Sequence, residues 1–316
     1  MASVLSQAYF QDEAAAFAEL EAIVWPNGPV CPHCGCMGRI SALNGVKDKN
    51  GKVRLGLKKC YDCRKQFTVR KNTVFEDSKV PLHIWFQAAF LLCSSKKGVS
   101  ANQLHRTLGV SLQTGWFMGH RLREAMREGD LAAMGGPGQI VEADETYYGD
   151  KETVVTRTKR GKSGHSSKRP VISLVQRGGR VRSFTPESAD GRTVRAIVRE
   201  NIDRETRLMT DESRLYTVVG KEFASQETVI HSEDEYVRGD IHTNTVEGFF
   251  GIFKRGMRGV YQHCKEKHLH RYLAEFDFRY NNRVKLGVND SARTMRALGG
   301  IVGKRLMYRD SLADHV

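Results

Sequence analysis

The stretch QIVEADETYYG at residues 139–149 decides the fold of the second half of this chain. Its β-branched and aromatic residues are typical of a β-strand. A hairpin over 169–188, turning at Gly178–Gly179, and short strands at RLMTDE and ETVIHSE predict the rest of a sheet. Helical patterns follow at GRTVRAIVRENI, from Asn244 to Gly256, and at LHRYLAEFDFRYNN. This order of elements predicts a mixed α/β domain.

Three acidic residues lie where a metal-dependent phosphoryl-transfer site needs them. Asp144 lies within the first strand, Asp211 at the end of RLMTDE, and Glu247 inside the helix that begins at Asn244. Lys254 follows seven positions after Glu247 on the same helical face. Two Mg²⁺ ions roughly 3.5–4 Å apart, held by carboxylates, stabilise the attacking and leaving oxygens of a displacement at phosphorus. Each acid alone is more often an ordinary surface carboxylate, but together they predict a two-metal site.

Four of the seven cysteines form two CxxC pairs, in CPHCG at 31–35 and in CYDC at 60–63. Four thiolates in tetrahedral array suit zinc, and a closed four-ligand site is structural. An iron–sulfur cluster, a redox dithiol and chance are the alternatives. We expect a structural Zn²⁺ in a small ribbon over residues 26–75, with these ligands: Cys31, Cys34, Cys60 and Cys63.

The remaining segments before residue 139 predict helices. Residues 1–25 predict one helix, and residues 80–130 predict a helix-turn-helix-like region that turns at Gly109. In DNA-binding proteins of that type the second helix enters the major groove, whereas an ordinary helical hairpin needs no DNA. The outward candidates on the second helix are Gln113, Thr114, His120, Arg121 and Arg123. The glycine-rich LAAMGGPGQ at 131–139 is a plausible domain boundary.

The charge balance favours a polyanionic partner. The chain holds 50 Lys and Arg against 36 Asp and Glu, a formal charge of +14, and neutralising phosphates releases counterions. A basic enzyme with no nucleic-acid role is the plainer alternative. No apolar run approaches the length of a membrane span, and the N-terminus lacks the pattern of an export signal. We therefore expect a cytoplasmic protein without a membrane partner.

These motifs together resemble one family of transposases. The two CxxC pairs, VEADETYYG, TDES and HTNTVEGFFGIFKRGMRG resemble the insertion-sequence family 1595, whose members carry a zinc ribbon and an ISXO-like catalytic domain. The resemblance covers roughly residues 15–295. It implies a ribonuclease-H-like DDE transposase domain, which we place at 136–295 before a C-terminal tail at 296–316.

The resemblance also implies an activity and its partners. The implied enzyme is a polynucleotidyl transferase that uses Mg²⁺ or Mn²⁺ to cleave and join double-stranded DNA at terminal inverted repeats. Asp144 and Asp211 match the family's first two catalytic acids. The third ligand is Glu247, favoured by its spacing, or Asn244 one turn earlier, and Lys254 serves the same site. Synapsis of two element ends implies a homo-oligomer.

A DNA-binding regulator, or a relic that binds without cutting, is the rival from another class. Its ribbon, helices and charge would look the same. A pure binder has no reason to keep Asp144, Asp211 and Glu247 with Lys254 in these contexts. The acidic set therefore favours the enzyme.

Overall fold

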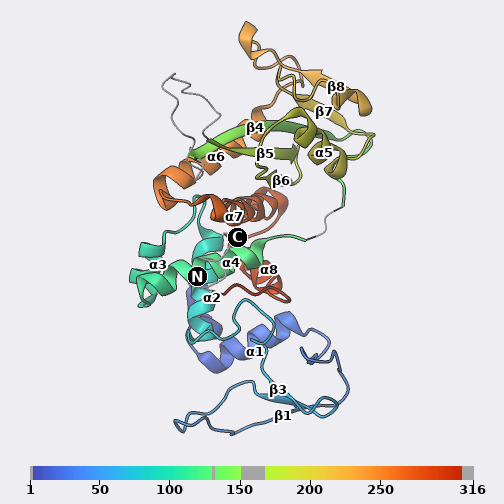
Figure 1. The fold of residues 1–316 in the computed structure, drawn as a ribbon. Coiled ribbons are helices and arrows are strands. Elements are labelled where there is room, and N and C mark those ends of the chain that lie inside the picture. The colour runs from blue at the N-terminus through green and yellow to red at the C-terminus, as the bar shows by residue number, and fades with distance from the viewer. Residues whose placement is uncertain (1–2, 130–131, 151–167, 308–316) are drawn as a thin grey trace. The chain divides into compact units, whose positions relative to one another are not determined.

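The computed structural model describes residues 3–129, 132–150 and 168–307. The chain forms two compact units, one made of residues 1–127 with 288–316 and the other of residues 128–287 (Figure 1). Among the described residues, no helix is both long and apolar enough to span a membrane.

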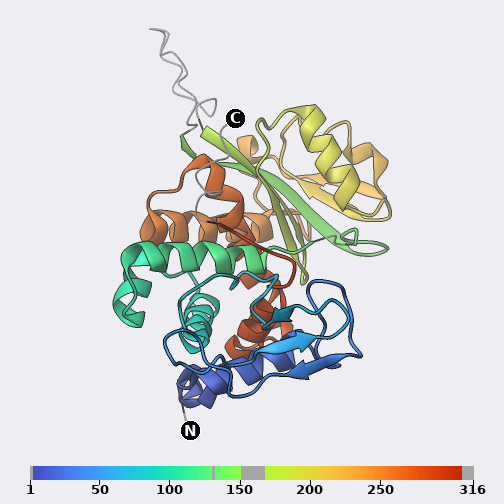
Figure 2. The same ribbon diagram turned by 60° about the horizontal axis from the view of Figure 1, so that its bottom comes forward.

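The first unit combines a small antiparallel sheet with helices. Its sheet is drawn in blue in Figure 2. The strand order is β1-β2-β3, with Ile40 opposite Cys60 and Lys58 opposite Phe67. The elements are α1 (Glu13–Val24), β1 (Ile40–Ala42), β2 (Lys58–Cys60), β3 (Gln66–Phe67), α2 (Leu82–Ser94), α3 (Ala101–Leu108), α4 (Leu112–Met126) and α8 (Asp290–Gly299).

The C-terminal segment is part of the first unit's helical core. Helix α8 packs against α2, where the buried Arg293 donates to the carbonyl of Cys93 at 2.7 Å. Leu298 and Ile301, in the predicted tail, are fully buried. Residues 308–316 of that tail lie outside the described residues.

Helices α3 and α4 form a tight helical pair. Gly109 ends α3 in the left-handed region with φ 66°, and the Ser111 side chain caps α4 by accepting from Thr114. A Cβ at Gly115 would lie 3.1 Å from the Ala101 carbonyl, so a glycine permits this close approach. The recognition role of α4 remains a prediction.

Three of the five outward predictions on α4 are wrong, because His120, Arg121 and Arg123 are all buried. Arg121 is buried and donates to the carbonyl oxygens of Glu76 and Leu306, at 3.0 and 3.2 Å. The helical pattern could not show this, because both acceptors come from segments distant in sequence. Arg121 therefore holds the first unit together rather than facing a DNA groove.

The second unit is built on a mixed five-stranded sheet with the order β6-β5-β4-β7-β8. The pairs β4–β5 and β5–β6 are antiparallel, whereas β4–β7 and β7–β8 are parallel. The elements are β4 (Ile140–Asp150), β5 (Lys168–Gln176), β6 (Val181–Phe184), α5 (Gly191–Asn201), β7 (Arg207–Thr210), β8 (Ser225–Thr228), α6 (Asn244–Gly256) and α7 (Leu269–Asn281). The predicted α/β order and the hairpin are confirmed.

Each face of this sheet supports a separate hydrophobic core. Val141 and Ala143 of β4 point to one core, which α5 covers with Val194 and Val198. The opposite core gathers alternate residues of β5 with apolar residues of α6 and α7. These two helices lie on one side of the sheet (Figure 1). Because side chains alternate along a strand, Glu142 and Asp144 of β4 face the side of α6.

Candidate active site and metal centre

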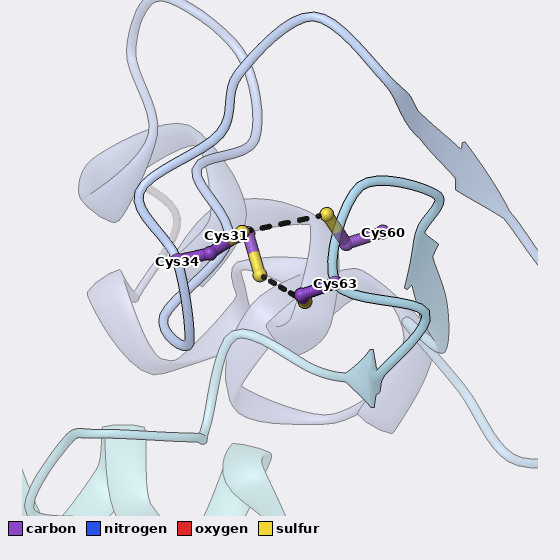
Figure 3. Close-up of side chains that lie close together, drawn as sticks. All are labelled: Cys31, Cys34, Cys60 and Cys63. Atoms are coloured by element: carbon purple, nitrogen blue, oxygen red, sulfur yellow. Dashed lines mark hydrogen bonds between the residues drawn. The ribbon is translucent and has the colours of Figure 1, made fainter.

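The four CxxC cysteines come together in the first unit (Figure 3). The Sγ atoms of Cys31 and Cys63 are 3.6 Å apart, and those of Cys34 and Cys60 are 3.7 Å apart. All four sulfurs lie within 4.8 Å of one another. Sulfurs bound at 2.3 Å around a tetrahedral zinc are separated by about 3.8 Å. The cluster therefore has the dimensions of a zinc site.

The surrounding backbone favours thiolates, which are the form that binds metal. The backbone amide of Cys63 lowers the pKa of the Cys60 thiol to about 7. At Cys34 a backbone hydrogen bond at Cys36 also lowers the thiol pKa, but burial and the neighbouring thiols outweigh it and raise that pKa to about 12. Cys36 contributes through its backbone, because its carbonyl accepts from the amide of Cys31 at 2.9 Å. Four cysteine ligands leave no open position, so the centre suits a structural role.

In the second unit, neighbouring parallel strands bring two predicted acids together. The β4–β7 register pairs Glu142 with Met209, an offset of 67 residues (209 − 142). The same offset from Asp144 reaches Asp211, immediately after β7. In-register neighbours in a parallel pair point to the same face, so both carboxylates lie on the side of α6.

These two carboxylates line one cleft of about 410 Å³. Burial, followed by the nearby Asp211 and Glu145 carboxylates, raises the pKa of Asp144 to about 8. Burial also raises the pKa of Asp211. The cleft therefore concentrates carboxylates that disfavour one another's charge, which is an electrostatic environment that suits a cation.

Cationic side chains line the other part of the same cleft: Lys168, Lys254 and Arg258. Lys254 lies in the last turn of α6, and Arg258 lies in the π-helical segment Met257–Tyr261 that continues it. Burial and the neighbouring Arg258 lower the pKa of Lys254. Carboxylates and cations in one cleft can hold metal ions and phosphate groups side by side.

Asn244 and Glu247 lie on the exposed side of the first turns of α6, outside the lining of this cleft. Glu247 is close enough to Asp144 to raise its pKa, after burial and the nearer acids. Its Oε1 accepts from the hydroxyl of Thr243 at 2.8 Å and lies 3.5 Å from His231 Nε2. The structure thus brings Asp144 and Asp211 together, and Glu247 lies near enough to affect Asp144 from a helix outside the cleft lining.

The spacing of the acids differs from that of the cysteines. Among the described residues, Asp144, Asp211 and Glu247 do not form a group whose ligand atoms all lie within 4.8 Å. Two ions about 4 Å apart, each about 2.1 Å from its oxygens, allow ligands of opposite ions to lie up to about 8 Å apart. The ligand atoms of these three acids are therefore spread more widely than those of the four cysteines.

Sequence reasoning missed two neighbours of these acids. Glu145 lines the same cleft as Asp144, and its carboxylate accepts from the hydroxyls of Tyr216 and Ser213, at 2.9 and 3.4 Å. Burial and Asp211 raise its pKa. His231 reaches Glu247 from the segment after β8. Glu145 could have been found from the sequence because it follows Asp144 directly. No feature of the sequence indicated that His231 lies near Glu247.

Comparison with protein families identifies the chain as a transposase with a zinc ribbon. Residues 135–281 match the ISXO2-like transposase domain, and residues 11–66 match the transposase zinc-ribbon domain. Both domain models belong to the IS1595 type, and the chain is a member of the IS1595-type transposases. The four clustered cysteines are accordingly those of a zinc ribbon that fits a structural Zn²⁺.

One protein from a transposable element is similar in sequence to most of this chain. An uncharacterized protein in transposable element ISH50 of Halobacterium salinarum is 29% identical over 286 residues, covering 85% of this chain and 91% of that protein. Among solved structures, a chain of the simian T-cell lymphotropic virus intasome in complex with PP2A regulatory subunit B56 gamma is 12% identical, with a TM-score of 0.29. That match covers 56% of this chain and 63% of the other.

Proposed function

We propose that this transposase binds the terminal inverted repeats of its element and cleaves and joins DNA strands at the cleft formed by Asp144 and Asp211. The observation that carries the proposal is the register of β4 and β7, which puts both acids beside each other opposite Lys254 and Arg258. A binder that did not cut DNA would gain nothing from buried carboxylates that repel both phosphates and one another.

The strand order of the second unit supports a ribonuclease-H-like fold for this domain. Three antiparallel strands are followed by two that run parallel to the central β4, and helices cover both faces. The central strand carries the first acid, its parallel neighbour the second, and a helix across the sheet the third candidate. This is the distribution of acids that the family resemblance implies.

The donor set fits Mg²⁺ or Mn²⁺, which would supply charge stabilisation for the attacking and leaving oxygens. Asp144, Asp211 and a ligand from α6 would hold the ions. Lys254 and Arg258 are placed to bind the phosphates of the reacting strand, and the half-buried position of Lys254 strengthens that attraction.

Two displacements at phosphorus account for the proposed reaction. Water first displaces a 3′-oxygen at the element end and leaves a 3′-hydroxyl and a 5′-phosphate. The 3′-hydroxyl then attacks a target phosphodiester, forming one P–O bond while one breaks, so that joining needs no energy source. The carboxylates would hold the ions, and the cationic side chains would hold the strand in line.

The first unit is proposed to recognise the element ends. Its ribbon exposes basic side chains such as Arg64 and Lys65, and the first turn of α4 exposes Leu112 and Gln113. The formal charge of +14 supports a DNA partner. We further propose that two or more copies assemble, because two ends must be cut and joined together.

Variants of α6 test both the reaction and its third ligand. The assay incubates a labelled duplex carrying the element end with Mg²⁺ or Mn²⁺, comparing the natural chain with Glu247→Gln and Asn244→Ala. If Glu247 is the ligand, Glu247→Gln should lower cleavage about 100-fold or more, since a metal ligand contributes several kcal/mol. Asn244→Ala should then retain cleavage within about fivefold.

If Asn244→Ala lowers cleavage about 100-fold and Glu247→Gln does not, Asn244 is the third metal ligand. Equal losses in both variants would place both side chains in the site. Cleavage unaffected by either change would remove α6 from the ligand set, and products formed equally well in EDTA would contradict the metal-dependent reaction.

A further inference from the structure

Glu142 is a buried carboxylate outside the proposed metal ligands and phosphate-binding residues. It lies on β4 two residues before Asp144, points to the same face, and is 0% exposed. Its Oε2 accepts from the backbone amides of Thr245 and Val246, at 2.8 and 2.9 Å, and its Oε1 accepts from the Thr245 hydroxyl at 2.7 Å. Three of its hydrogen bonds therefore end on the first turn of α6.

Arg177 extends this anchor to the segment that precedes α6. It lies at the β5–β6 turn, and its Nε donates to Glu142 Oε1 at 2.6 Å. Its two terminal nitrogens donate to the carbonyl oxygens of Asp240 and His242, at 2.6 and 2.8 Å. The pair thus fixes the path of the backbone into the helix, and Arg177 balances the buried negative charge.

The start of α6 is capped from another element, as is the start of α2, where Glu13 of α1 accepts from the amide of His83 at 3.1 Å, and both differ from helix starts with a local cap. Helices such as α4 and α5 are capped by their own N-cap residues, Ser111 and Asp190.

The N-cap residue of α6, Thr243, makes no side-chain cap within the described part of the chain, and its hydroxyl donates to Glu247 instead. Glu142 of the central strand instead accepts from the amides of Thr245 and Val246, which lack partners within the helix. Its negative charge also interacts favourably with the N-terminus of the helix dipole.

We propose that Glu142 is a positioning residue, which fixes the start of α6 to the strand that carries Asp144. The inference rests on the proposed function, because it matters only if Asp144 and a side chain of α6 act together. Farther along the same strand face, Tyr148 packs against Phe253 of α6 with ring centroids 5.6 Å apart. Asp144 lies on β4 between Glu142 and Tyr148, the two residues that contact α6. These contacts therefore fix the distance between α6 and Asp144.

Metal binding and catalysis depend strongly on the distance between Asp144 and the side chains of α6. Groups that orient metal ligands typically contribute 10- to 100-fold in metal affinity or activity. Loosening the first turn of α6 would displace both Asn244 and Glu247 relative to Asp144. Glu142 itself touches neither DNA nor metal in this account.

The test compares Glu142→Ala and Glu142→Gln with a matched control, Asp190→Ala. Asp190 also caps a helix with its carboxylate, accepting from the amides of Arg192 and Thr193, but α5 carries none of the proposed site residues. Glutamine keeps one carbonyl oxygen for the α6 amides and removes the charge that Arg177 faces. Three readouts are measured: hydrogen exchange of the helix-start amides, Mn²⁺ binding to the zinc-loaded protein, and cleavage of the element end.

Glu142→Ala is expected to speed exchange at Thr245 and Val246 at least tenfold, to weaken Mn²⁺ binding and to slow cleavage 10- to 100-fold. Glu142→Gln should fall between the alanine variant and the natural chain. Asp190→Ala should speed exchange only at the start of α5 and keep cleavage within about twofold. The glutamine variant keeps the test decisive if the alanine variant does not fold.

Other results would overturn the inference. Cleavage within twofold in both Glu142 variants, or an equal loss in Asp190→Ala, would show that Glu142 does not position the site. If the natural chain does not cleave DNA, the proposed function fails first. In that case Mn²⁺ binding tests the role of Glu142. Binding that weakens in the Glu142 variants but not in Asp190→Ala supports the positioning role, and unchanged binding in the Glu142 variants refutes it.

Discussion

Replacing Asp144 with asparagine is expected to reduce DNA cleavage and strand transfer by about a thousandfold or more. The side chain keeps its size, but it loses the charge that would hold the metal ions, and their stabilisation of the transition state amounts to several kcal/mol at about 1.4 kcal/mol per tenfold in rate. Gel assays of end-labelled DNA with Mg²⁺ measure the loss.

The same variant should fold and bind DNA as well as the natural chain. Burial and the neighbouring Asp211 and Glu145 raise the pKa of Asp144 to about 8, so the metal-free site already favours a neutral side chain at this position. Thermal unfolding and a mobility-shift assay check these two points. Loss of DNA binding in Asp144→Asn would contradict the division between an end-binding unit and a cutting unit, and retained cleavage would remove Asp144 from the site.

Removing zinc is expected to unfold the ribbon. Its three strands hold eight residues, and its buried cluster consists of Cys31, Cys60 and Phe67, with Trp25 packed against it. So small a core depends on the metal, which contributes about 10–16 kcal/mol in zinc-finger peptides. Cys60→Ser, or a strong chelator, should release about one equivalent of zinc and change the fluorescence of Trp25, whose ring lies 5.9 Å from that of Phe67.

Cys36→Ser is the matched control in the same ribbon. Cys36 lies near Cys60 and Asp62 but outside the set of four sulfurs, so this variant should keep its zinc and its fluorescence. DNA binding should fall in Cys60→Ser and persist in Cys36→Ser. A folded ribbon in Cys60→Ser without zinc would show that the metal is dispensable for the fold.

Local patterns were sufficient to predict much of the fold. The β-branched and aromatic residues around Asp144 and the turn at Gly178–Gly179 predicted a strand and a hairpin that the structure contains. The two CxxC pairs predicted a four-cysteine cluster, which is confirmed. These features could be predicted because side-chain periodicity, turn chemistry and ligand spacing are all encoded over a few residues.

Contacts between distant segments could not be predicted in the same way. Glu142 meets Thr245 across 103 residues, and Arg121 meets Leu306 across 185. No periodicity shows that a strand carboxylate will cap a helix so far along the chain, or that an arginine on a predicted recognition helix will turn inward. The sequence predicted that Asp144 and Asp211 share a site, and the strand register explains how the fold brings them to one cleft.

Product mapping on a labelled duplex that carries the element's own end, incubated with target DNA and Mg²⁺, tests the central claim most directly. We predict a nick at the element end that leaves a 3′-hydroxyl, and a second product in which that end is joined to the target strand. Specific binding of the end without either product would contradict the account, and would instead assign the chain to the proteins that bind element ends without cutting them.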